Sequence, residues 1–254
     1  MNNTSITSVV IPEGVTYIGY DSYNRCYSLT TVVLPTSLVT IEYGTFTNCQ
    51  SLINISLPDS LEYIGEYAFS NCVSLTSVEI PNSVSTIEQY AFEMCSLLTN
   101  VQLSTSLTEL SKGVFRECVA LTNVIIPESV TTIGFTAFLS CRSLQSIVIP
   151  EGVKVLKEYA FLGCNELRIV YLPSTLEEIH TRTFGYCYKF ETIVIPESVT
   201  FIDAEAFVDC SYLEIFLNNN EVPSTWNENW NYSNCSVYFA GEWEYDDGIP
   251  MPLI

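Results

Sequence analysis

Positively charged side chains are scarce in this sequence. Nine Lys and Arg residues stand against 29 Asp and Glu residues, which gives a formal net charge of −20 at pH 7. Nucleic-acid binding depends on cationic side chains that neutralise phosphates, and anionic membrane surfaces attract basic segments for the same reason. The composition therefore argues against DNA, RNA and anionic lipid as partners. An acidic surface of this kind favours solubility.

Long apolar runs and a basic, apolar N-terminal segment are also missing. No stretch approaches the roughly 20 apolar residues of a membrane-spanning helix, and the first residues lack the features of a signal peptide. We therefore expect no membrane span, while the localisation stays open between the cytoplasm and a mature or excised surface fragment. Hydrophobic residues make up 48% and charged residues 15% of the chain, and this balance predicts a folded core.

Residues suited to catalysis or metal binding are few. His180 is the single histidine, and no glycine-rich phosphate loop occurs. A serine or cysteine nucleophile needs a base that is itself oriented by a partner, so we expect no enzyme activity and an exposed, variable position for His180. Asp246-Asp247-Gly248 lacks the further ligands of a calcium loop and is expected to form a turn. We expect no metal and no cofactor.

The chain instead contains a repeat with a period of 23 residues. Proline, aromatic and leucine columns keep this spacing, and so does a column of nine cysteines. The cysteines are Cys26, Cys49, Cys72, Cys95, Cys118, Cys141, Cys164, Cys187 and Cys210. So many columns in register predict a stack of similar structural units.

Each unit encodes two short extended segments and a turn. In residues 78–80 apolar and polar side chains alternate, as in a strand with one buried face. Pro81 ends that strand because it cannot donate to a ladder, and residues 84–87 resume an extended pattern. Apolar residues spaced by three over 92–98 suit one tight helical or 3₁₀ turn. No unit can bury its apolar side chains alone, so stacked neighbours complete the core.

The pattern L-x-x-I-x-I-P-x-x-V-x-x-I-x-x-x-A-F-x-x-C, as in Leu52 to Cys72, resembles the BspA-like leucine-rich repeat family. The resemblance covers residues 6–217. It implies an α/β fold, a right-handed leucine-rich-repeat solenoid with a parallel β-sheet on one side and short helical or 3₁₀ turns on the other. It also implies surface display in many members, with extracellular matrix or host proteins as partners.

The repeat columns fail near the C-terminus, so we divide the chain into a nine-repeat solenoid at 1–218 and a C-terminal cap at 219–254. All three tryptophans, Trp226, Trp230 and Trp243, lie in the second part. The open end of a solenoid exposes core side chains and unpaired strand groups, so a cap packed on the last repeat is expected. Residues 236–239 are predicted to form its last strand.

The cysteine column has a structural interpretation and two chemical alternatives. Metal sites need ligands that converge on one point, whereas these residues form a line. Stacked neighbours lie roughly 4.8 Å apart and point the same way, while a disulfide needs facing Cβ atoms at about 3.8 Å. Free cysteine commonly acts as a small buried hydrophobe. We therefore predict nine reduced, buried thiols. Cys235 lies outside the column and is expected to be partly exposed.

The outward side chains of the first strand suggest a binding surface. In the later repeats they form an apolar stripe, and exposed stripes of this kind often mark interaction sites. The candidate binding residues are Ile125, Val148, Ile169, Tyr171, Val194, Ile215 and Leu217. The alternative is ordinary strand surface, because β-branched residues suit strands in any case.

These observations favour a non-enzymatic protein-binding repeat domain, expected from the resemblance to be a surface or secreted adhesion module. Its partners would be proteins, host or matrix proteins among them, or a second copy through self-association. Two alternatives stay open at this point. One is a purely structural spacer, and the other is a carbohydrate or matrix binder that uses surface tyrosines such as Tyr67, Tyr90 and Tyr159.

Overall fold

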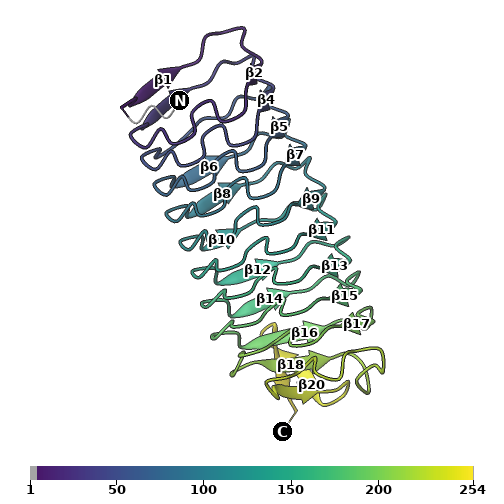
Figure 1. Cartoon of the computed structure of the whole chain (residues 1–254). Coiled ribbons are helices and arrows are strands. Elements are labelled where there is room, and N and C mark those ends of the chain that lie inside the picture. The colour runs from purple at the N-terminus through teal and green to yellow at the C-terminus, as the bar shows by residue number, and fades with distance from the viewer. Residues whose placement is uncertain (1–4, 254) are drawn as a thin grey trace.

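The computed structural model describes residues 5–253, which wind into about ten coils stacked along one axis (Figure 1). Most coils contribute one strand to each of two rows that run the length of the stack. The parallel solenoid that the repeat period predicts is therefore confirmed. None of the described residues belongs to a helix long and apolar enough to cross a membrane.

The first row of strands carries the candidate binding stripe. Up to β16, parallel neighbours within it pair residues one period apart, as Val148 pairs with Tyr171. Its strands are β1 (Ser8–Val10), β3 (Thr31–Val33), β6 (Ser77–Glu79), β8 (Asn100–Gln102), β10 (Asn123–Val124), β12 (Ser146–Val148), β14 (Ile169–Tyr171), β16 (Thr192–Ile195), β18 (Glu214–Leu217) and β19 (Ser236–Tyr238). In β6 the middle residue is buried and its neighbours are exposed, as the alternating pattern predicts.

The second row consists of two-residue strands that follow the proline of each repeat, or Ser104 in the repeat that lacks it. They are β2 (Tyr17–Ile18), β4 (Thr40–Ile41), β5 (Tyr63–Ile64), β7 (Thr86–Ile87), β9 (Glu109–Leu110), β11 (Thr132–Ile133), β13 (Val155–Leu156), β15 (Glu178–Ile179) and β17 (Phe201–Ile202). These strands also pair in parallel with the coil before and after. The tail adds an antiparallel hairpin of β20 (Trp243–Asp246) and β21 (Ile249–Pro252).

The predicted helical or 3₁₀ turns are not found, because residues 5–253 contain turns but no helix. Two positions in each of these segments have positive φ, for example Tyr67 at 55° and Asn71 at 59°. Alternate amides then bond in different directions. Ser70 N–H donates to Tyr67 O in its own coil at 3.0 Å, whereas Phe69 N–H donates to Ala91 O of the next coil at 2.8 Å. A helix would keep every such bond within one segment.

The core consists of parallel columns of identical side chains. Phenylalanine rings from Phe46 to Phe207 stack with centroids 5.2–5.9 Å apart. All nine cysteines of the repeat are buried thiols. Each thiol from Cys72 onward donates to the carbonyl of a phenylalanine in the preceding coil, as Cys72 Sγ does to Phe46 O at 3.2 Å. The cysteine column thus fills space and bonds successive coils.

The tail continues the stack before it folds back. Trp230 lies 23 residues after Phe207 and packs edge-on against it, with ring centroids 6.2 Å apart. Trp226 contacts Trp230 and donates from Nε1 to Val199 O at 3.1 Å. Strand β19 then pairs with β18. The tail therefore packs on the ninth coil, and the division at residue 218 stays a prediction.

Candidate binding surface

Three residues of the predicted stripe form an exposed apolar line across the first row of strands. Ile125, Val148 and Tyr171 are 79%, 61% and 52% exposed. They occupy the same position in successive coils, and Val148 and Tyr171 are direct partners in the β12–β14 ladder. In the coils directly before them this position holds exposed polar residues such as Glu79 and Gln102, whereas the first coils hold the exposed Val10 and Val33. The apolar character is therefore not a requirement of the strand itself.

The stripe does not continue to Ile215 and Leu217, and this part of the prediction needs correction. Both side chains are fully buried. The reason is the register, because Ile193 pairs with Ile215 and Val194 pairs with Phe216. The coil that carries β18 is therefore one residue shorter between Leu213 and its strand than the coil before it is between Phe190 and β16. A one-residue slip moves every side chain of a strand to the opposite face.

Phe216 takes the outward position, and the tail covers it. Tyr238 of β19 stacks on its ring with centroids 5.0 Å apart, and Trp243 of β20 packs edge-on at 5.5 Å. Trp243 Nε1 also donates to Leu217 O at 3.0 Å. These contacts anchor the hairpin β20–β21 over the strand face of the last coils. The stripe consequently ends at a wall rather than at the end of the stack.

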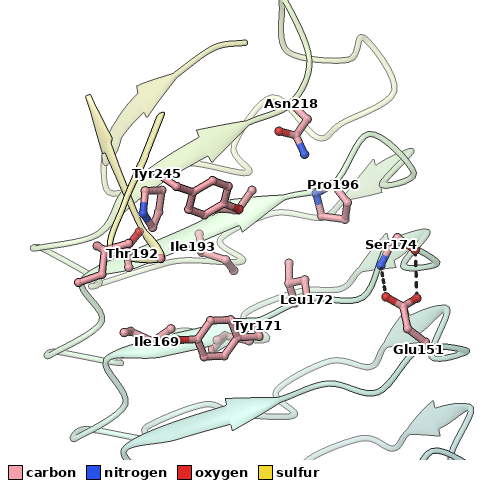
Figure 2. Close-up of a pocket in the computed structure, with 15 residues that line it drawn as sticks. Glu151, Ile169, Tyr171, Leu172, Ser174, Thr192, Ile193, Pro196, Asn218 and Tyr245 are labelled. Carbon is pink, nitrogen blue, oxygen red and sulfur yellow. Dashed lines mark hydrogen bonds between the residues drawn. The ribbon is translucent and has the colours of Figure 1, made fainter. Parts of the chain in front are cut away.

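A groove of about 330 Å³ lies between this wall and strands β14 and β16 (Figure 2). Ile169 and Val194, the two other predicted stripe residues, are half-buried and line it. Tyr245 and Ile249 of the hairpin form the opposite side, and Figure 2 shows the Tyr245 ring above β16. Tyr171 lies at the groove as well. The structure thus joins the exposed stripe to a walled apolar groove.

Polar groups border the groove on one flank. Glu151 accepts hydrogen bonds from Ser174 N at 3.0 Å and from Ser174 Oγ at 3.1 Å (Figure 2). Asn218 lies on the same flank beside Pro196. Ligand sites commonly combine apolar walls with a few polar groups that fix orientation. This arrangement can hold an extended apolar segment and orient it through one polar side.

The reactive side chains of the chain are engaged in structural contacts. His180 is half-buried rather than exposed as predicted, because its Nε2 lies 2.8 Å from Glu178 Oε2 and its ring packs against Phe201. Burial raises the pKa of the Cys49 thiol to about 12 and of the partly exposed Cys235 thiol to about 11. Both thiols therefore stay protonated at neutral pH. Among residues 5–253, no cluster of His, Cys, Asp or Glu could hold a metal ion.

The hairpin residues of the groove were missed by the sequence prediction, although a signal for them exists. Asp247 and Gly248 have φ values of 47° and 80°, and Asp246 pairs with Ile249 across them. An Asp-Gly pair between extended segments is a strong hairpin signal because both positions favour positive φ. The turn expected at these residues is therefore the tip of the hairpin. That the hairpin folds onto the strand face depends on Phe216, which the register slip places outward.

Comparison with known proteins identifies the family. The model of the BspA type leucine rich repeat region matches residues 1–122 and 97–214, with six copies. The chain therefore belongs to the BspA-type leucine-rich repeat family. It is similar to a leucine-rich repeat protein from T. pallidum, with 30% identity, a TM-score of 0.51 and coverage of 72% of this chain and 78% of that one. It is also similar to a leucine-rich repeat protein from Bacteroides ovatus, with 25% identity, a TM-score of 0.50 and coverage of 89% and 75%. No curated protein matches the chain in sequence.

Proposed function

We propose that this protein is a non-enzymatic binding module that holds an extended, apolar segment of a partner protein. The observation that carries the proposal is the line of Ile125, Val148 and Tyr171 leading into the groove beside the hairpin. A leucine-rich repeat solenoid is compatible with protein interaction. Surface display and host or matrix partners, which the family resemblance implies for many members, belong to this proposal and go beyond the fold.

The dimensions of the surface favour an extended occupant. The stripe crosses the strands at roughly 4.8 Å per coil, so the distance from Ile125 to the wall at Phe216 is roughly 20 Å. A fully extended segment of about six residues spans this length. Its apolar side chains would meet the stripe and the groove, and its backbone would meet the polar flank at Ser174 and Asn218. Tyr171 lies at the centre and combines an apolar ring with a hydroxyl, as binding hot spots often do.

A random-peptide display library selected on the immobilised protein tests the proposal. Peptides enriched in apolar residues should be recovered, and Tyr171→Ala with Val148→Ser should weaken their binding by more than tenfold in fluorescence polarisation. The matched control is Ser56→Ala with Gln102→Ala, which changes the same column in the earlier, polar coils. This pair should change binding by less than twofold. Circular dichroism should show both variants folded, because the four side chains are exposed.

Four results would contradict a peptide-binding groove. If no sequence is enriched, or if both pairs of substitutions act alike, the surface is ordinary sheet and the spacer function stands. Light scattering that shows a dimer, lost only in the Tyr171 and Val148 variant, assigns the stripe to self-association. Oligosaccharide binding that survives this variant would direct attention to the tyrosines elsewhere on the solenoid.

A further inference from the structure

A second surface lies along the turns of the early coils, away from the strand stripe. It combines aromatic rings with carboxylates, and we call it the aromatic–acidic edge. Its members are Tyr43, Tyr67, Tyr90, Glu42, Glu66 and Glu88. The rings form a row, because Tyr43 packs edge-on against Tyr67 with centroids 5.7 Å apart and Tyr67 stacks on Tyr90 at 5.1 Å. The three carboxylate residues are half-buried, and each lies one or two positions before a ring residue in the sequence.

The carboxylates of this edge have no cationic partner within the described residues. Each of the ion pairs found in residues 5–253 involves a cation at position 116 or later, and none includes Glu42, Glu66 or Glu88. Arg25 is the single Lys or Arg residue among the first 110 positions. Burial, then Glu93 and Tyr90, and then Glu66 raise the pKa of Tyr67, which places Glu66 near the row of rings. Glu88 and Glu42 lie near the neighbouring Tyr63 of β5, whose pKa is raised by burial and then by these two carboxylates. Within residues 5–253 these three carboxylates thus form no ion pair, and Lys112 beside Tyr90 is a cation at the end of the row.

The chain itself shows how a cation fits between such rings. Lys112 is in the same repeat column as Tyr43 and Glu66. Its Nζ lies 5.5 Å from the ring centroid of Tyr90 and 5.3 Å from that of Phe135. Ammonium groups within about 6 Å of an aromatic face are attracted by the ring quadrupole. Glycine at position 113 makes room for this arrangement, because a Cβ there would come within 2.3 Å of the Tyr90 ring.

We propose that the aromatic–acidic edge binds a Lys- or Arg-rich extended segment of a partner protein. Lys112 occupies the last place of the row, and the preceding coils offer rings and free carboxylates to further cations. Three coil spacings separate Tyr20 from Gln89, the counterparts of Lys112 in the first and fourth coils, or roughly 14 Å. An extended segment with three basic residues at alternate positions covers a similar length. Complementary charge would also accelerate its association.

A sugar ligand fits this edge less well. Sugars stack on open ring faces, whereas Tyr67 and Tyr90 cover one face of each other at an interplanar angle of 8°. A neutral ligand would also leave the three carboxylates uncompensated. Basic side chains can contact the aromatic rings and also neutralise the carboxylates. A cationic protein segment therefore fits this edge better than a sugar.

Fluorescence polarisation with a labelled Lys-Thr-Lys-Thr-Lys-Thr peptide tests the proposal. Glu42→Gln with Glu88→Gln should raise the dissociation constant by more than tenfold. The matched control, Glu221→Gln with Glu244→Gln, removes the same charge from exposed positions in the tail and should change it by less than twofold. Equal effects of the two pairs would show general attraction to an acidic protein and would overturn the proposal.

The contribution of the rings is tested at constant charge. Tyr67→Leu with Tyr90→Leu should weaken the same peptide by about threefold to tenfold, with the fold checked by circular dichroism. If these substitutions unfold the protein, Gln89→Lys supplies a second test, because it places a cation one coil before Lys112 and should compete with the peptide. A peptide with acetylated lysines that binds as well as the parent would overturn the proposal. Tyr171→Ala should leave binding of this basic peptide unchanged. A failure of the proposal for the aromatic–acidic edge can therefore be distinguished from a failure of the proposed peptide-binding groove.

Discussion

Single residues in unusual backbone conformations shape the turns of this solenoid. Each repeat places two residues at positive φ, and most of them are not glycine. Met94, at 59°, and Gly163, at 73°, occupy the same column three repeats apart. Left-handed conformation costs an L-residue roughly 1–2 kcal/mol. The hydrogen bonds to the neighbouring coil, such as Met94 N–H to Arg116 O at 2.7 Å, hold the chain in this conformation.

Glycine at position 94 should therefore stabilise the protein. Met94→Gly is expected to raise the free energy of unfolding by up to about 1 kcal/mol, since relief of the left-handed strain outweighs the entropy of glycine. The control is Leu97→Gly, three residues away at an exposed position without positive φ, which should lose about 0.5–1 kcal/mol. Urea titrations followed by circular dichroism measure both. A similar loss in the two variants would show that position 94 carries no strain.

At the scale of the element, the coil that carries β18 shows what the sequence predicts and what it misses. The 23-residue spacing of Cys187 and Cys210 correctly predicts where this coil lies in the stack, because buried side chains stack in columns only when the period is constant. The slip after Leu213 is hidden, since Ile215 and Leu217 preserve an apolar alternation that fits either register. The turns were misjudged for a related reason. A spacing of three describes both a helical turn and this row of turns, and residues such as Tyr67 give no glycine signal for positive φ.

The corrected register predicts opposite effects for two residues of the original stripe. Ile215→Ala should lower the free energy of unfolding by about 2–5 kcal/mol, as expected for truncation of a buried isoleucine. Val148→Ala changes an exposed side chain and should stay within about 0.5 kcal/mol. Chemical denaturation of the two variants under identical conditions compares them directly. Equal and small losses would mean that Ile215 faces solvent and that the stripe extends as first predicted.

At the scale of the whole molecule, the cysteine column ties stability to pH. Burial raises the pKa of the Cys49 thiol from 9.0 to about 12. It also raises the pKa of the thiols of Cys72 and Cys95 in the next two coils. A raised pKa in the folded state means that the protonated thiol is favoured by folding. Its contribution is complete below pH 9, where unfolded thiols are also protonated. It is then lost as pH rises from about 9 toward the folded value.

The protein should consequently become less stable in mild alkali. Between pH 9 and 10 each buried thiol that ionises only on unfolding lowers the free energy of unfolding, with a limiting slope of about 1.4 kcal/mol per pH unit. Urea midpoints at pH 7, 8, 9 and 10 in the presence of a reductant measure the decline. Cys49→Ala should make the decline of the free energy of unfolding with pH less steep, because one buried thiol fewer then ionises on unfolding. Constant stability up to pH 10 would show that the thiols already ionise in the folded state.

The tryptophans give the molecule a local reporter. All three lie between residues 226 and 243, where Trp226 and Trp230 are buried in the final coil and Trp243 covers Phe216. Intrinsic tryptophan emission therefore observes one end of the stack, while circular dichroism averages over every coil. In repeat proteins each unit contacts only its neighbours, so the ends can fray before the middle. The difference between the two denaturation midpoints measures how strongly the last coil is coupled to the rest, without any label.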